Sequence, residues 1–215
     1  MIKLGISLRV VKAEKYDEKR DALSHDWPIL LEKLGIIPVY IPNILSDLKE
    51  FLKNTDVNCL LLSGGDNIGD NPERDTSEKN IIEYGINNKI PILGVCRGMQ
   101  SLNNFFGGSV DKNRNSNHVG RPHSVKISNT FLQSLFESNS INVNSYHNNV
   151  ITKENLSKQL TSFAEYETDQ TIEGFFHKKY PIMGVMWHPE RNPDNTSELI
   201  LSRFFCDNEF WKKII

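Results

Sequence analysis

The chain has 215 residues, of which 38% are hydrophobic and 24% are charged. This composition predicts one soluble domain over residues 1–215, and a formal charge of −2, from 25 basic and 27 acidic side chains, argues against nucleic-acid and membrane partners. No apolar run reaches the length of a membrane span, the N-terminal segment has a strand pattern, and three cysteines are too few for a disulfide scaffold. We therefore expect a cytoplasmic protein.

The first half of the chain alternates apolar segments of strand length with segments of helical periodicity. Strands are predicted at residues 2–8, 36–41, 57–62 and 91–95. Helices are predicted at residues 22–34, 45–53 and 77–87, with a fourth that ends at residue 106. This order predicts an α/β fold, a flavodoxin-like three-layer sandwich with a mostly parallel central sheet. The mixed charges at 17–20 are expected to form a solvated loop or a helix end.

The second half begins with residues 107–120, which are rich in Asn, Ser and Gly. They predict a long loop near the functional edge of the sheet, a candidate lid. Short strands are predicted at residues 123–128, 141–145, 160–166, 171–176 and 182–186. These strands indicate a small antiparallel extension of the sheet. Residues 195–213 predict a single amphipathic helix.

The segment G-V-C-R-G at residues 94–98 follows an apolar strand and opens a helix. Glycines on both sides of Cys96 are typical of a sharp strand-to-helix turn that presents a nucleophile. The positive end of the helix macrodipole favours the thiolate, so we expect Cys96 to be reactive at neutral pH. Cys59 lies in a strand pattern and Cys206 in a helical one, and both are expected to be packing residues.

A second pair of polar residues, His188 and Glu190, follows the strand predicted at 182–186. His188 has the pKa range to take a proton from Cys96 and return it to a leaving amine, and Glu190 can orient the imidazole. Because Cys96 and His188 both come just after a strand, we expect them at the same edge of the sheet. Cys96, His188 and Glu190 are the predicted catalytic residues.

The segments G-V-C-R-G-M-Q and W-H-P-E resemble the class I glutamine amidotransferase superfamily, whose members cleave the γ-amide of glutamine with a Cys-His-Glu triad. Further segments, L-S-G-G-D, P-E-R-D-T-S-E and N-S-Y-H-N, are similar to its γ-glutamyl hydrolase branch. Arg97 fits that branch, since ammonia-donating members commonly carry Leu directly after the Cys. The resemblance implies hydrolysis of a γ-glutamyl C–N bond through a thioester, with no metal or organic cofactor.

An oxyanion forms when Cys96 attacks a carbonyl group, and it needs preorganised N–H donors. The backbone amide of Arg97, directly after the nucleophile, is one candidate. The second lies in the glycine pair at residues 64–65, which ends the strand predicted at 57–62. Within this pair, the resemblance points to Gly65 as the donor.

Gln100 stands one helical turn after Cys96, where its amide can face the same pocket as the thiol. By resemblance, four residues are predicted to bind the glutamyl group: Gln100, Tyr146, Asn148 and Asn149. His147 is expected to have a structural hydrogen-bonding role, because His188 already supplies the base. His118 and His123 have no Cys or carboxylate at metal-ligand spacing, so no metal site is expected.

Arg74, Asp75 and Glu78 match the R-D-x-x-E element of the hydrolase branch. The two acids come early in a predicted helix, so we expect them to cap it and to complement its dipole. The role of Arg74 is left open: it could contact an anionic part of the substrate or form an internal ion pair.

The expected partner is a small γ-glutamyl molecule, but the leaving group is left open. The candidates are a γ-glutamyl amine such as γ-glutamyl-γ-aminobutyrate, a γ-glutamyl-CDP-amidate of capsule phosphoramidate synthesis, and glutamine whose ammonia passes to a partner synthase. For a nucleotide, Arg74, Arg114 and Arg121 are candidate phosphate ligands. A non-catalytic ligand-binding module is the alternative from a different class. The oligomeric state is open, a homodimer included.

Overall fold

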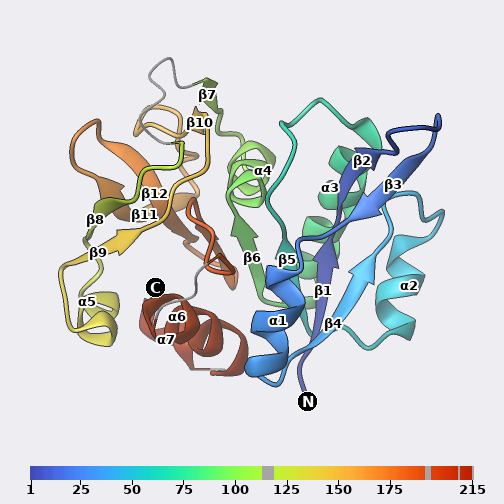
Figure 1. Cartoon of the computed structure of the whole chain (residues 1–215). Helices are drawn as coiled ribbons and strands as arrows, with labels where there is room; N and C mark the ends of the chain where they lie inside the picture. Colours follow the sequence, from blue (N-terminus) through green and yellow to red (C-terminus); the bar gives the residue numbers. More distant parts are fainter. Residues whose placement is uncertain (113–118, 192–194, 208, 215) are drawn as a thin grey trace.

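A computed structural model describes residues 1–112, 119–191, 195–207 and 209–214 of the chain. Its main element is a nine-stranded sheet flanked by helices (Figure 1). From one edge to the other, the strands are β4 (Ile37–Ile41), β1 (Lys3–Ser7), β5 (Cys59–Leu62), β6 (Ile92–Val95), β13 (Ile182–Val185), β12 (Thr171–His177), β11 (Leu160–Tyr166), β8 (His123–Ile127) and β9 (Ser140–Val143). The predicted α/β class is confirmed.

The first five strands of that order, β4 to β13, pair in parallel. Every residue of β5, β6 and β13 is buried, as expected for parallel strands covered by helices on both faces. Leu62 pairs with Gly94 and Val95 pairs with Val185, so these three strands end side by side. The segments that follow them carry Gly65, Cys96 and His188, which therefore meet at one edge of the sheet.

Two apolar cores fill the space between the sheet and its helices. One core packs against α1 (Asp26–Lys33), α5 (Thr130–Phe136), α6 (Asn195–Cys206) and α7 (Phe210–Ile214). The other packs against α2 (Leu48–Asn54), α3 (Pro72–Asn88) and α4 (Arg97–Phe105). The sheet is thus the middle of three layers. Among the described helices, none combines the length and the apolar character needed to cross a membrane.

The antiparallel extension begins where β12 pairs with β13 and continues through β11, β8 and β9. Near the functional edge, β7 (Asp111–Lys112) pairs with β10 (Asn149–Val150), and Val119 forms a bridge with Tyr146. Part of the candidate lid at 107–120 is therefore tied to the segment around residue 149. Residues 113–118 of that lid, with Arg114 and His118, lie outside the described residues.

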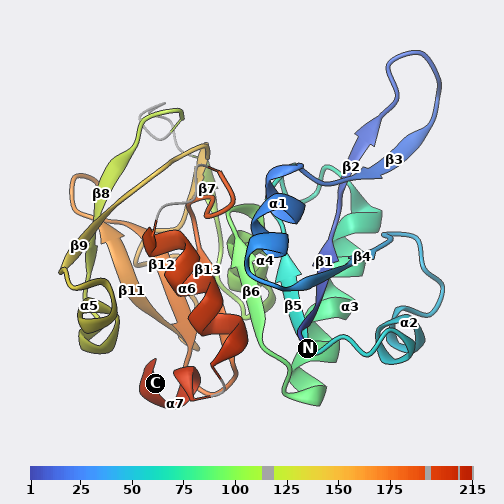
Figure 2. The same cartoon turned by 60° about the horizontal axis from the view of Figure 1, so that its bottom comes forward.

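The structure differs from the sequence predictions at four places. The charged residues 17–20 run into β3 (Lys19–Ala22), which pairs with β2 (Arg9–Lys12) in a hairpin that projects from the sheet (Figure 2). The hairpin was missed because most of its residues are exposed and lack an apolar face.

The other three differences concern helices. Helix α3 begins at Pro72, earlier than predicted, because the fixed φ of proline suits the first turn of a helix. The segment that forms α5 was not predicted as a helix. The single helix predicted at 195–213 is instead the pair α6 and α7. The chain turns at Asp207, whose side chain accepts a hydrogen bond from the Glu209 N–H just before α7.

Candidate active site

Cys96 stands on the turn between β6 and α4. Its backbone (φ 50°, ψ −104°) lies in a region that residues with side chains rarely adopt and that is found at strained functional sites. A Cβ on Gly98 would lie 2.0 Å from the Leu62 carbonyl oxygen, and one on Gly94 would lie 2.6 Å from the Gly98 backbone. Only glycine allows this approach of strand and helix, so the chain has the backbone of the predicted nucleophile elbow.

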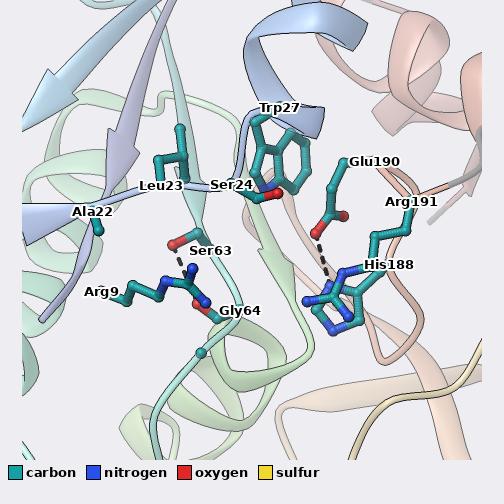
Figure 3. A pocket seen from close by; sticks show the side chains of 11 residues that line it. Arg9, Ala22, Leu23, Ser24, Trp27, Ser63, Gly64, His188, Glu190 and Arg191 are labelled. Carbon is teal, nitrogen blue, oxygen red and sulfur yellow. Dashed lines mark hydrogen bonds and ion pairs between the residues drawn. The ribbon is translucent and has the colours of Figure 1, made fainter. Parts of the chain in front are cut away.

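His188 follows β13, the strand beside β6, and its Nδ1 donates to Glu190 Oε1 at 2.7 Å (Figure 3). Both side chains are buried. Asn144 holds the His188 backbone from both sides: its Oδ1 accepts from the His188 N–H at 2.8 Å, and its Nδ2 donates to the His188 carbonyl at 2.8 Å. The sequence assigned no role to Asn144, although it opens the motif N-S-Y-H-N.

The Cys96 thiol and the His188 imidazole share a hydrogen bond. Burial disfavours the charged form of each group, but this bond and the mutual attraction outweigh burial. The pKa of Cys96 is therefore lowered, and that of His188 is raised to about 9, with a further contribution from Glu190. The lowered pKa of Cys96 and the raised pKa of His188 both favour a thiolate–imidazolium pair, in which the thiolate can attack a carbonyl carbon and the imidazolium can then donate a proton.

A second buried pair of ionisable groups, His147 and Glu173, lies close enough to the thiol to act on its pKa. His147 Nδ1 donates to the Asn149 carbonyl at 3.0 Å, which fits the structural role expected for it, but its Nε2 also lies 3.5 Å from Glu173 Oε1. Burial disfavours the charged form of both groups. Hydrogen bonds with His123 and His147 nevertheless lower the pKa of Glu173 to about 2. Glu173 in turn raises the pKa of His147. The positive charge of His147 also helps lower the Cys96 pKa.

Sequence reasoning missed Glu173. The feature that could have revealed it is a single carboxylate within β12, a strand whose residues are all buried. A buried carboxylate almost always has a partner of opposite charge, but the strand pattern does not say which one.

The two predicted oxyanion donors belong to segments that lie close to the thiol and the imidazole. The N–H of Arg97 hydrogen-bonds the Cys96 sulfur and contributes to its lowered pKa. Next to the imidazole, a Cβ on Gly64 would lie 2.7 Å from His188 Cε1, and Gly65 has a φ of +132°, which favours glycine. The placement is compatible with both donor roles, which stay predictions.

The R-D-x-x-E element forms a buried ion cluster rather than a helix cap. Glu78, fully buried, accepts from Arg74 Nε at 3.0 Å, from Ser7 Oγ at 2.9 Å and from Arg97 Nη1. Asp75 does lie in the first helical turn, but its carboxylate binds the Arg97 guanidinium. The capping role expected of Glu78 is wrong, because its side chain points inward to two arginines instead of to the helix end.

Arg74 is part of the same cluster and is fully buried. Its Nη2 donates to the Ser63 and Gly64 carbonyls at 2.8 and 3.0 Å, and so supports the loop that carries Gly65. The internal ion pair is therefore the alternative that the structure selects. Arg74 has no exposed surface with which to hold a phosphate.

A cleft of about 570 Å³ lies beside the thiol helix α4 and receives two of the predicted substrate residues. Gln100 and Asn149 line it together with Asn67, whose Oδ1 accepts from Asn149 Nδ2 at 3.0 Å. Tyr146 lies elsewhere, with its ring 5.8 Å from that of His188. Asn148 is exposed and does not line this cleft, and its substrate contact stays a prediction.

Replacing Glu190 with glutamine is expected to lower kcat/KM by about 10²- to 10⁴-fold, because His188 loses the carboxylate that orients it and stabilises its charge. Glu190 raises the pKa of His188, so its loss should also move the alkaline limb of the pH profile, near pH 9, to lower pH. The measurement is kcat/KM against pH, with the exposed Glu167→Gln as control. An alkaline limb at the same pH in Glu190→Gln would contradict the assignment.

Residues 4–208 match the family model of class I glutamine amidotransferases. The chain belongs to this family, which makes it an enzyme that acts on carbon–nitrogen bonds.

Relatives similar to the chain are named for different activities. The chain is 32% identical to the gamma-glutamyl-CDP-amidate hydrolase of Campylobacter jejuni over 94% of its own length and 96% of the relative's. It is also 32% identical to anthranilate synthase component 2 of Cyanophora paradoxa, over 86% and 93% of the two chains. The crystal structure of a putative GMP synthase subunit from Thermoplasma acidophilum superposes with a TM-score of 0.72 at 25% identity, over 95% and 92%.

Proposed function

We propose that this protein is a cysteine-dependent hydrolase of a γ-glutamyl C–N bond. The thiolate of Cys96 attacks the γ-carbonyl carbon, and the N–H groups of Gly65 and Arg97 bind the oxyanion. The His188 imidazolium then gives its proton to the leaving nitrogen, the C–N bond breaks, and a γ-glutamyl thioester remains. His188, now neutral, takes a proton from the water that cleaves the thioester, and glutamate leaves. The observation that carries this proposal is the placement of Cys96 on the turn after β6 and of His188, bonded to Glu190, after the adjacent strand β13.

The glutamyl group would occupy the cleft of about 570 Å³ next to Gln100. The leaving group we favour is a nucleotide amidate, because the similarity to the hydrolase from Campylobacter jejuni covers nearly the whole chain. The proposal includes a cytoplasmic location, which is expected from the sequence, and a role in capsule phosphoramidate synthesis, one of the alternatives that the sequence left open.

The second candidate is a glutaminase that passes ammonia to a partner synthase, and the similarity to anthranilate synthase component 2 supports it. Arg97 favours the hydrolase. Its guanidinium is buried between Glu78 and Asp75, and a Leu at this position, common in ammonia-donating members, could make neither ion pair.

The hydrolase and the glutaminase candidates predict different activities for the purified protein without a partner. Glutamate release would be measured with γ-glutamyl-CDP-amidate, γ-glutamyl-γ-aminobutyrate and glutamine, without any second protein. We expect the highest kcat/KM with the amidate. A preference for glutamine that appears only with a partner synthase would overturn the hydrolase and support the glutaminase.

A further inference from the structure

A second, smaller pocket lies beside His188 and is separate from the cleft that Gln100 lines. It encloses about 30 Å³ and is bordered by the glycine loop, by α1 and by the segment after β13. Two arginines border it: Arg9, the first residue of β2, and Arg191, three positions after His188. Figure 3 shows their guanidinium groups turned toward the space between them from opposite sides of the pocket.

Each arginine lies against a neighbouring segment of the chain. The Arg9 side chain crosses the glycine loop, with its Cβ 3.1 Å from where a Cβ on Gly65 would stand. The Arg191 guanidinium lies 4.5 Å from the ring centre of Tyr146. Stacking on an aromatic ring uses the face of a guanidinium and leaves its N–H edge available for an anion.

Within the described part of the chain, neither guanidinium has a carboxylate partner. The Nε of Arg9 is buried and has no hydrogen-bond partner there. The two arginines that are fully buried in the described structure, Arg74 and Arg97, differ because they bind Glu78 and further acids. One carboxylate does line the pocket, that of Glu190, but its Oε1 accepts the hydrogen bond of His188. Glu190 Oε2 is buried and has no hydrogen-bond partner among the described residues. Within that part of the chain, the two guanidinium groups therefore have no carboxylate partner of their own.

We propose that Arg9 and Arg191 form a subsite for an anionic phosphoryl group bonded directly to the scissile nitrogen. This inference rests on the proposed function and specifies its leaving group. In an acyl phosphoramidate the phosphorus is attached to the nitrogen that His188 protonates, so the phosphoryl oxygens must lie next to His188. The small volume holds oxygens of that group, and the nucleoside stays outside the pocket.

The proposed reaction accounts for two guanidinium groups next to His188. When the C–N bond breaks, the proton from His188 goes to the nitrogen, and the phosphoryl group keeps its negative charge throughout. Guanidinium groups bind phosphoryl oxygens through charge-assisted hydrogen bonds. The ammonia released from glutamine has no anionic group to place in this subsite, and the carboxylate of γ-glutamyl-γ-aminobutyrate lies several bonds further from the nitrogen.

The first test compares substrates in Arg9→Met and Arg191→Met, which retain an unbranched apolar stem. We expect the ratio of kcat/KM for γ-glutamyl-CDP-amidate to that for glutamine to fall by about 10- to 100-fold in each variant. Arg20→Met, on the same hairpin but exposed and paired with Glu18, is the matched control and should leave the ratio unchanged. An unchanged ratio in both pocket variants would overturn the subsite. An equal fall in the ratio of γ-glutamyl-γ-aminobutyrate to glutamine would overturn the phosphoryl assignment.

The second test does not depend on turnover. Binding of cytidine 5′-diphosphoramidate and of uncharged cytidine to the full chain would be measured by calorimetry. We expect the diphosphoramidate to bind more tightly than cytidine, and Arg9→Met and Arg191→Met to weaken it about 10-fold or more. If the protein binds it in this way yet hydrolyses no γ-glutamyl substrate, the proposed function fails and the subsite stands. Equal binding in the variants and in the unaltered protein would overturn the subsite.

Discussion

Cys96→Ala is expected to lower the rate of glutamate release by at least about 10⁴-fold, because no other group can form the thioester. The fold should survive, since alanine fills the same buried turn and removes only the sulfur. The measurements are glutamate release with each γ-glutamyl substrate, and near-ultraviolet circular dichroism to verify the fold. Kinetics close to those of the unaltered protein would refute the mechanism.

The other two cysteines provide the controls for this prediction. Burial raises the pKa of Cys59 to about 12 and also raises that of Cys206, whereas the pKa of Cys96 is lowered. Iodoacetamide near neutral pH should therefore alkylate Cys96 first, as peptide mass spectrometry would show. Cys206→Ala should retain full activity, because this residue ends α6 and lines a pocket that contains none of the predicted site residues. Preferential labelling of Cys206 would contradict the thiolate assignment.

Glu78→Ala is expected to lower the free energy of unfolding by about 3–5 kcal/mol, because it leaves two buried arginines without their shared carboxylate. Arg74 and Arg97 both bind Glu78, and Arg74 also supports the carbonyls of the glycine loop. Activity should fall as well, since the loop that carries Gly65 loses part of its support. The measurement is urea unfolding followed by circular dichroism.

The pH dependence of stability offers a further check on Glu78. Burial raises its pKa, but the two arginines and Ser7 outweigh burial and lower it below its ordinary value of 4.5. The stabilisation is therefore present above that value and is lost as the pH falls through the folded-state pKa. Glu167→Ala, which removes an exposed pair with Lys126, should cost less than about 1 kcal/mol. A similar small loss in Glu78→Ala would contradict the cluster's role.

Much of the site follows from patterns that are local in the chain. Glycines beside Cys96 indicate a sharp turn because only they allow α4 to approach β5, and the Cβ distances at Gly98 agree. The apolar strands before Cys96 and His188 indicate one sheet edge because parallel strands all end on the same side. Here the registers place β6 beside β13.

The arginines show where such reasoning stops. The sequence named Arg74 as a candidate phosphate ligand, but the tertiary structure buries it against Glu78. The guanidinium groups that line the pocket beside His188, and have no carboxylate partner among the described residues, belong to Arg9 and Arg191, residues without a motif. A side chain's charge is visible in the sequence, while its partner depends on which distant segments pack together.

Residue order was enough to predict the α/β class, the elbow at Cys96 and the position of His188 and Glu190 after a strand, because these features depend on hydrophobic period and turn chemistry. Which charges meet was settled by the packing of the folded chain. Glu173 reaches His147, and Arg9 crosses Gly65, through contacts between segments far apart in the chain. Ion pairing in a buried environment is governed by distance and desolvation, and neither quantity can be obtained from residue order alone.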